Sequence, residues 1–221
     1  MRTEGFQFWR YLPDGRVLPV GQLAVRQEEN GRLSEIQFRY LSEYLALPEA
    51  IPLDPAHAPL RSTLFQFETD GHNLPGFVSD AMPDAWGQRV LAAVLKRKHL
   101  DPMTILRHAG SSVTGDLVIR PWNSGGDWSP SVPLSEIQAF VAKGWHGDLE
   151  YCLENIEYIS LLQQGGSGAR GARPKLLVND NGVEWLYKFN RSDDPFNVAE
   201  EEYRCMSFAR AAGVPTPDCE V

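Results

Sequence analysis

The sequence predicts an α+β fold, in which a small β-rich N-terminal subdomain with helices is followed by an antiparallel sheet and a helix. Three observations support this fold class. Short apolar and aromatic segments, separated by turn residues, fill the first 40 residues. Asp84 precedes an apolar stripe at helical spacing that includes Trp86 and Val90. A glycine-rich loop from Gly165 to Pro174 then precedes a hairpin pattern and a further helix.

Residues 1–122 are expected to form the first subdomain. Strands are expected at residues 6–9, 17–25, 36–40, 64–68 and 117–119. The Asn-Gly pair at 30–31 is a hairpin signal. Asp84 is interpreted as the cap of a helix that buries Trp86 in a core, and Asp101 as the cap of a second helix with proline in its first turn. The sequence identifies no basic partner for Asp116.

A segment rich in glycine, serine and proline at residues 123–130 predicts a boundary, so residues 131–221 are expected to form the second domain. Helices are expected at 134–143, 148–164 and from about 197 to 212, and the two strands of a hairpin at 175–178 and 183–189. An Asn-Gly pair at 181–182 would form the hairpin turn. The second domain therefore has the order helices, glycine-rich loop, hairpin, helix.

Composition excludes several classes of protein. The net charge of −8 argues against a large non-specific nucleic-acid surface. The basic cluster from Lys96 to Lys98 is explained by its place at the end of a predicted helix. The three cysteines show no CxxC spacing and the histidines are scattered, so no metal site is expected. Without a long apolar segment or a signal peptide, the protein is expected to be cytoplasmic and not membrane-bound.

The order of the second domain indicates a nucleotide site. A glycine-rich loop approaches phosphates closely and offers backbone N–H donors. Lys188 lies in the second strand of the hairpin, and acidic residues including Glu202 lie near the start of the following helix. In a protein-kinase small lobe, such a lysine contacts the α- and β-phosphates and a helix glutamate fixes it.

Each part taken alone has a simpler reading. The loop could be a surface loop, Lys188 a solvated strand residue, and the acidic residues at 200–202 a complement to the helix dipole. Two other nucleotide folds fit poorly. A P-loop requires GxxxxGK[ST] before a helix, whereas here Pro174 precedes Lys175 and a strand follows. No strand–GxGxxG–helix unit is present for a dinucleotide fold.

Several short motifs resemble one family in order and spacing, across nearly the whole chain. Residues 171–175 (GARPK) resemble the phosphate loop of HipA-like serine/threonine kinases, the toxins of bacterial toxin–antitoxin pairs linked to persistence. Residues 82–87 (MPDAWG) resemble the family's LPDxWG segment. Further similarity lies at residues 20–23, 38–40, 115–117 and 202–215.

The resemblance implies roles for individual residues. Glu202 would pair with Lys188, which would contact the α- and β-phosphates of ATP bound with Mg²⁺. Ser167 is the candidate for a regulatory phosphorylated serine, although counting back from Lys175 places the family's serine on Gly168. The complete set of implied nucleotide-binding residues is Gly168, Ala169, Arg170, Gly171, Ala172, Lys175, Lys188 and Glu202.

The resemblance also implies partners, namely a HipB-like antitoxin and a protein substrate of the translation machinery, with DNA contacted only through the antitoxin. No segment of the sequence offers the catalytic aspartate or the metal-binding aspartate that phosphoryl transfer requires. We therefore expect the chain to be the N-terminal part of a longer kinase and to be inactive alone. The complete kinase is expected to bind ATP and Mg²⁺, whereas the sequence does not decide whether this part alone binds them. The alternative is a non-catalytic binding module that contacts an antitoxin or restrains a separate kinase lobe.

Overall fold

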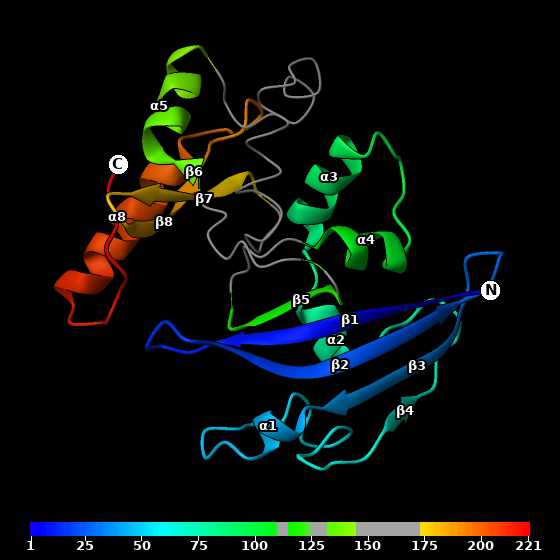
Figure 1. Ribbon diagram of the computed structural model, residues 1–221. Helices are drawn as coiled ribbons and strands as arrows, with labels where there is room; N and C mark the ends of the chain where they lie inside the picture. The colour runs from blue at the N-terminus through cyan, green and yellow to red at the C-terminus, as the bar shows by residue number, and fades with distance from the viewer. Residues whose placement is uncertain (110–114, 123, 125–131, 145–172) are drawn as a thin grey trace.

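The computed structural model describes residues 1–109, 115–122, 124, 132–144 and 173–221. Within them the chain forms two sheets with helices, which confirms the α+β class (Figure 1). The expected helix at 148–164 and the loop up to residue 172 lie outside the described residues. No helix in the described part is long and apolar enough to cross a membrane.

The larger sheet contains five antiparallel strands in the order β4-β3-β2-β1-β5. These are β1 (Arg2–Tyr11), β2 (Val17–Gln27), β3 (Leu33–Tyr40), β4 (Phe65–Phe67) and β5 (Leu117–Pro121). The five strands expected from the sequence are all present, and the first three are longer than expected. Gly21 sits where β2 and β3 approach closely, because a Cβ there would lie 2.6 Å from the Arg39 carbonyl oxygen and from the Phe38 ring.

Four helices accompany this sheet: α1 (Ser42–Leu45), α2 (Gly76–Asp80), α3 (Ala85–Val94) and α4 (Pro102–His108). The two expected caps are confirmed. Asp84 accepts hydrogen bonds from the backbone N–H groups of Trp86 and Gly87, and Asp101 accepts one from Thr104. The sequence did not predict α2, because five residues are too few to show a helical period.

One hydrophobic core lies between the larger sheet and the helices α2 and α4. Phe8 and Phe38 meet edge to face with ring centroids 5.7 Å apart, and Phe77 of α2 contacts both rings. Such aromatic contacts add stability beyond the area they bury. The fully buried residues include Phe6, Phe8, Val20, Val25, Ile36, Phe38, Val78, Met103, Leu106 and Ile119.

Asp116 does have a basic partner, which corrects the expectation from the sequence. Arg10 donates from Nε to Asp116 Oδ2 at 2.5 Å and from Nη1 to the Tyr44 hydroxyl at 2.9 Å. The antiparallel pairing of β1 with β5 brings the two residues together across 106 positions of sequence. A single sequence contains no local signal for a pair so far apart.

The smaller sheet has the order β6-β7-β8, with β6 (Val132–Pro133) parallel and β8 (Val183–Lys188) antiparallel to the central β7 (Lys175–Asp180). The Asn-Gly turn of the hairpin is confirmed, since Asn181 and Gly182 have φ values of 50° and 87°. Helix α5 (Leu134–Ala142) follows β6, and α8 (Val198–Ala211) follows β8. The two-residue β6 was too short to predict.

A second hydrophobic core joins the smaller sheet to α3. Trp86 and Val90 of α3 pack with Ile137 of α5 and with Leu176 and Val178 of β7. Figure 1 shows α3 on the side of the larger sheet that faces the smaller one. Helix α3 therefore precedes the expected boundary at 123–130 in sequence but contributes its buried face to the core of the smaller sheet.

Candidate functional site

The site begins with two lysines that face each other across the β7–β8 hairpin. Lys175 is the direct partner of Lys188 in the strand register. The Phe189 N–H donates to the Pro174 carbonyl at 3.1 Å, so the next pair, Lys175 with Lys188, is a non-hydrogen-bonded pair. Side chains in such a pair lie on one face of the sheet, with Cα atoms only about 4.5 Å apart. Two ammonium groups thus start from adjacent points at the open end of the hairpin.

Lys188 forms an ion pair with Glu202 of α8, as expected from the sequence. The two side chains are 38% and 39% exposed. An ion pair this open to water contributes only about 0–1 kcal/mol to stability. Its main effect is to fix the direction of the lysine ammonium.

Two asparagines place Glu202 over the hairpin. Asn197 caps α8 by accepting a hydrogen bond from the Glu200 N–H at 3.0 Å. Asn190, which follows β8, donates to the Asn197 side chain at 2.7 Å and accepts from the Ala199 N–H at 3.0 Å. The end of β8 and the start of α8 are therefore tied together by side chains, which fixes the position of Glu202.

The connection is further held by an ion pair between Arg173, which precedes β7, and Asp194, which precedes α8. Asp194 also accepts the Arg191 backbone N–H at 2.8 Å. The hydrogen bonds from Arg191 and Arg173 hold the pKa of Asp194 below its ordinary value. Asp194 thus stays ionised and links the end of the glycine-rich loop to the segment before α8.

Lys175 is the unusual member of the pair, because its side chain is buried. The residue is 5% exposed, and its Nζ has no hydrogen-bond partner among the described residues. Burial lowers the pKa of Lys175 below 10.5, and the Lys188 ammonium adds to this lowering, while the Asp84 and Glu202 carboxylates oppose it. A buried ammonium without partners is destabilising unless an anionic group satisfies it.

Helix α3 reaches the site through two residues that the sequence explained only as a cap and a core residue. Both of those roles are confirmed. In addition, the Trp86 indole Nε1 donates to the Lys175 carbonyl at 3.0 Å, and the Asp84 carboxylate raises the pKa of the Lys175 ammonium more than the Glu202 carboxylate does. In the sequence, this segment stands out only through the motif at residues 82–87, which resembles a family segment. That resemblance does not predict the contact between Trp86 and β7.

The remaining predicted site residues lie outside the described residues. These are Ser167, Gly168, Ala169, Arg170, Gly171 and Ala172. The described part of the predicted site consists of Lys175, Lys188 and Glu202, and the structure brings these three together around the start of β7.

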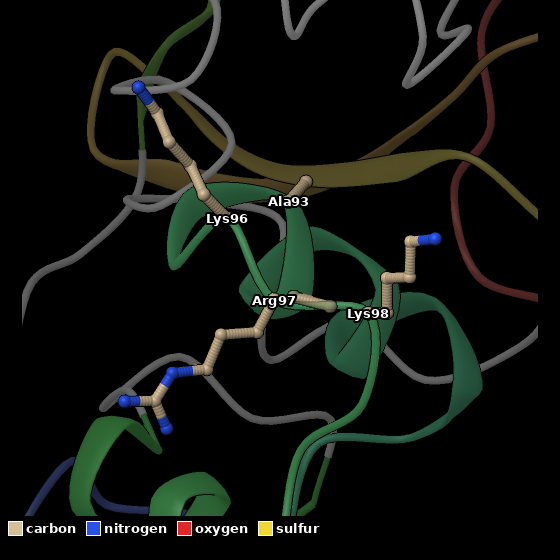
Figure 2. A pocket seen from close by; sticks show the side chains of 5 residues that line it. Ala93, Lys96, Arg97 and Lys98 are labelled. Carbon is tan, nitrogen blue, oxygen red and sulfur yellow. The ribbon is translucent and has the colours of Figure 1, made fainter.

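The basic cluster at residues 96–98 forms a separate surface feature. It lines a pocket together with Ala92 and Ala93, just beyond the last residue of α3, Val94. Figure 2 shows the side chains of Lys96, Arg97 and Lys98 pointing in different directions. The three residues directly follow Leu95, the C-cap residue of α3. No group of three or more His, Cys, Asp or Glu residues that could hold a metal occurs in the described part of the chain.

Two family models match the chain on either side of the expected boundary. A model of the HipA N-terminal domain matches residues 11–120, and a model of the HipA-like C-terminal domain matches residues 167–221. The first match covers β2, β3, β4 and most of β5 of the larger sheet together with α1 to α4, and it begins at the last residue of β1. The second match begins in the glycine-rich loop and includes the lysine pair and α8. No curated protein matches the chain. The two domain matches, in this order and around this geometry, show that the chain belongs to the HipA-like family.

Proposed function

We propose that this chain forms the ATP-gripping part of a HipA-like serine/threonine protein kinase of a toxin–antitoxin system. The observation that carries the proposal is the convergence of Lys175, Lys188 and Glu202. Two strand lysines start from one face of a hairpin, directly after a glycine-rich loop, and a helix glutamate orients one of them. A glycine-rich loop, one strand lysine and a helix glutamate are the positioning groups that a kinase small lobe uses for phosphates, and Lys175 adds a second cation beside them.

The buried ammonium of Lys175 supports a phosphate as the natural ligand. Within the described residues its Nζ lacks any hydrogen-bond partner. A phosphate oxygen bound there would offset the free-energy cost of burying this ammonium in the nucleotide-free chain. Lys188, oriented by Glu202, would contact a second phosphate oxygen. When bound, Mg²⁺ would neutralise charge on the phosphates. The role of the described residues is to hold the nucleotide.

The complete kinase would transfer the γ-phosphate of ATP to a serine or threonine of a protein in the translation machinery. A HipB-like antitoxin would be its partner, and DNA would be contacted only through that antitoxin. Transfer also needs an aspartate that receives the hydroxyl proton and a second that binds metal. We identify neither in this sequence, so the chain alone is expected to bind nucleotide in the cytoplasm without transferring phosphate. Ser167 remains the candidate for regulatory phosphorylation.

A non-catalytic binding module is the alternative function. The observation in its favour is that the larger sheet encloses its own core with α2 and α4, separate from the lysine pair. Such a unit could present a surface to an antitoxin whether or not nucleotide binds. Under this reading the lysine pair would have no ligand.

Calorimetric titration of the purified chain with Mg-ATP separates the two functions. We expect saturable binding that is lost in Lys188→Ala and retained in Lys98→Ala, an exposed lysine of the basic cluster. Circular dichroism checks that each variant is folded. A folded wild-type chain that binds no ATP, or equal binding by Lys188→Ala and wild type, would refute the proposed nucleotide site and favour the binding module.

A further inference from the structure

Among the described residues, no strand pairs with β7 at Lys175 on the side away from β8. In a non-hydrogen-bonded pair, the N–H and C=O of Lys175 point away from β8. On that other side, β6 pairs with β7 only at Val178 and Asn179. Within the described residues, the Lys175 carbonyl accepts a hydrogen bond from the Trp86 indole at 3.0 Å. A side chain of helix α3 therefore supplies the hydrogen bond that a neighbouring strand would otherwise donate to the Lys175 carbonyl.

Trp86 is buried and packed beside the strand that it contacts. The residue is 1% exposed and packs in the second core with Leu176 and Val178, whose side chains point to the opposite face of β7 from Lys175. One tryptophan thus contacts the strand both through an apolar face and through a directed hydrogen bond. Its position sets the place from which the Lys175 side chain starts.

The two carboxylate oxygens of Asp84 have different environments. Oδ1 accepts hydrogen bonds from the Trp86 and Gly87 N–H groups, at 3.0 and 3.1 Å, and so orients the first turn of α3. Oδ2 is buried and makes no hydrogen bond among the described residues. A cap alone does not require a second buried, unsatisfied oxygen, which is costly. The charge of Asp84 instead opposes the effect of burial on Lys175.

We propose that Asp84 and Trp86 are positioning residues of the nucleotide site, through which helix α3 fixes the place and the charge of Lys175. The proposal rests on the function proposed above and extends it to a segment of the N-terminal domain. The charged groups that act on Lys175 are then Asp84 of α3, Lys188 of β8 and Glu202 of α8. The nucleotide site is consequently built from both matched domains.

Two substitutions separate positioning from simple folding roles. Asp84→Ser keeps a good helix cap but removes the charge. Trp86→Phe keeps an aromatic ring in the core but removes the indole N–H. Asp101→Ser is the matched control, because Asp101 caps α4 in the same way and does not act on Lys175. Thermal unfolding of each variant reports any general loss of structure.

Mg-ATP binding by the full chain is then measured from pH 6 to pH 10. In Asp84→Ser, Lys175 loses its proton at lower pH, so we expect the fall in affinity at high pH to move downward, with about tenfold weaker binding per pKa unit. Trp86→Phe should weaken binding about tenfold at every pH, because the strand is less well fixed. Asp101→Ser should bind like wild type. A wild-type pH profile in Asp84→Ser, together with wild-type affinity in Trp86→Phe, would overturn the proposal.

A second measurement keeps this test independent of ATP. The ¹³Cε resonance of Lys175 is titrated in the nucleotide-free chain by NMR, and we expect its pKa to be lower in Asp84→Ser than in wild type or Asp101→Ser. If the wild-type chain binds no ATP but the Lys175 pKa falls, the proposed function fails while the link from Asp84 to Lys175 stands. If ATP binding depends on Lys188 but the Lys175 pKa does not move, the nucleotide site stands and the role of Asp84 is refuted.

Discussion

Replacing Lys175 by methionine should make the free chain more stable while it destroys the nucleotide site. Methionine is unbranched and close to the aliphatic part of lysine in shape, so it can occupy the same space. The substitution removes a buried ammonium that has no hydrogen-bond partner among the described residues. Residues kept at a cost to stability are typical of functional sites.

The size of the gain follows from what is removed and what is left. An unsatisfied buried polar group costs about 1–3 kcal/mol, and more when it is charged. Part of the gain is lost again, because the favourable electrostatic interaction between Lys175 and the Asp84 carboxylate is removed as well. We therefore expect Lys175→Met to raise the free energy of unfolding by about 1 kcal/mol. For a chain of this length that corresponds to a rise in Tm of roughly 2–4 °C.

The matched control is Lys188→Met, at the position directly opposite on β8. Its ion pair with Glu202 is more than a third exposed, so its loss should change stability by less than about 1 kcal/mol and in the unfavourable direction. Urea denaturation measures both variants, and Mg-ATP titration measures their binding. Destabilisation by Lys175→Met with wild-type ATP binding would refute the reasoning, because Lys175 would then be an ordinary packing residue.

The stability difference should also depend on pH. Burial lowers the pKa of Lys175 in the folded chain below its ordinary value of 10.5. Between those two pKa values the unfolded chain binds more protons than the folded chain, so wild-type stability rises with pH. The advantage of Lys175→Met is therefore largest below the folded pKa and shrinks as pH approaches 10.5. A constant advantage across this range would show that Lys175 titrates normally.

Two further predictions concern the larger sheet. Gly21→Ala should destabilise the chain by about 2 kcal/mol in urea denaturation, because its Cβ would lie 2.6 Å from a backbone oxygen, whereas Gly76→Ala, with open space around it, should not destabilise it. Equal midpoints would contradict the close approach of β2 and β3. The Glu4 carboxylate accepts two hydrogen bonds from Arg107, at 2.6 and 2.7 Å, which lower its pKa. Its stabilising effect should be complete above its ordinary pKa and disappear as pH falls through the lowered one, so the stability of Glu4→Gln should vary less over that acid range.

Local patterns in the sequence were sufficient for most of the fold. Asp84, Asp101 and the Asn-Gly turn at 181–182 act through neighbours within three residues, so their roles could be inferred without a structure. The pairing of Lys188 with Glu202 spans 14 residues and was expected because the hairpin and helix follow each other directly. These interactions are encoded locally or by the order of adjacent elements.

The contacts that could not be predicted all depend on how distant elements pack. Arg10 meets Asp116 through strand pairing, and Trp86 meets Lys175 across 89 residues. The burial of the Lys175 side chain could not be predicted either, because the pattern of its own strand does not show that a lysine on this face of β7 would be buried. Hydrophobic periodicity shows which face of an element is buried but not which element buries it.

Because Trp86 of the N-terminal domain packs in the core of the smaller sheet, the two domains are constrained to evolve together. A gene rearrangement that exchanged residues 1–122 for another version would also replace the helix that closes the edge of β7. The incoming helix would have to match Leu176 and Val178 in shape and offer an N–H group to the Lys175 carbonyl. The two halves are therefore expected to be inherited as a unit, with substitutions in α3 compensated by substitutions in β7.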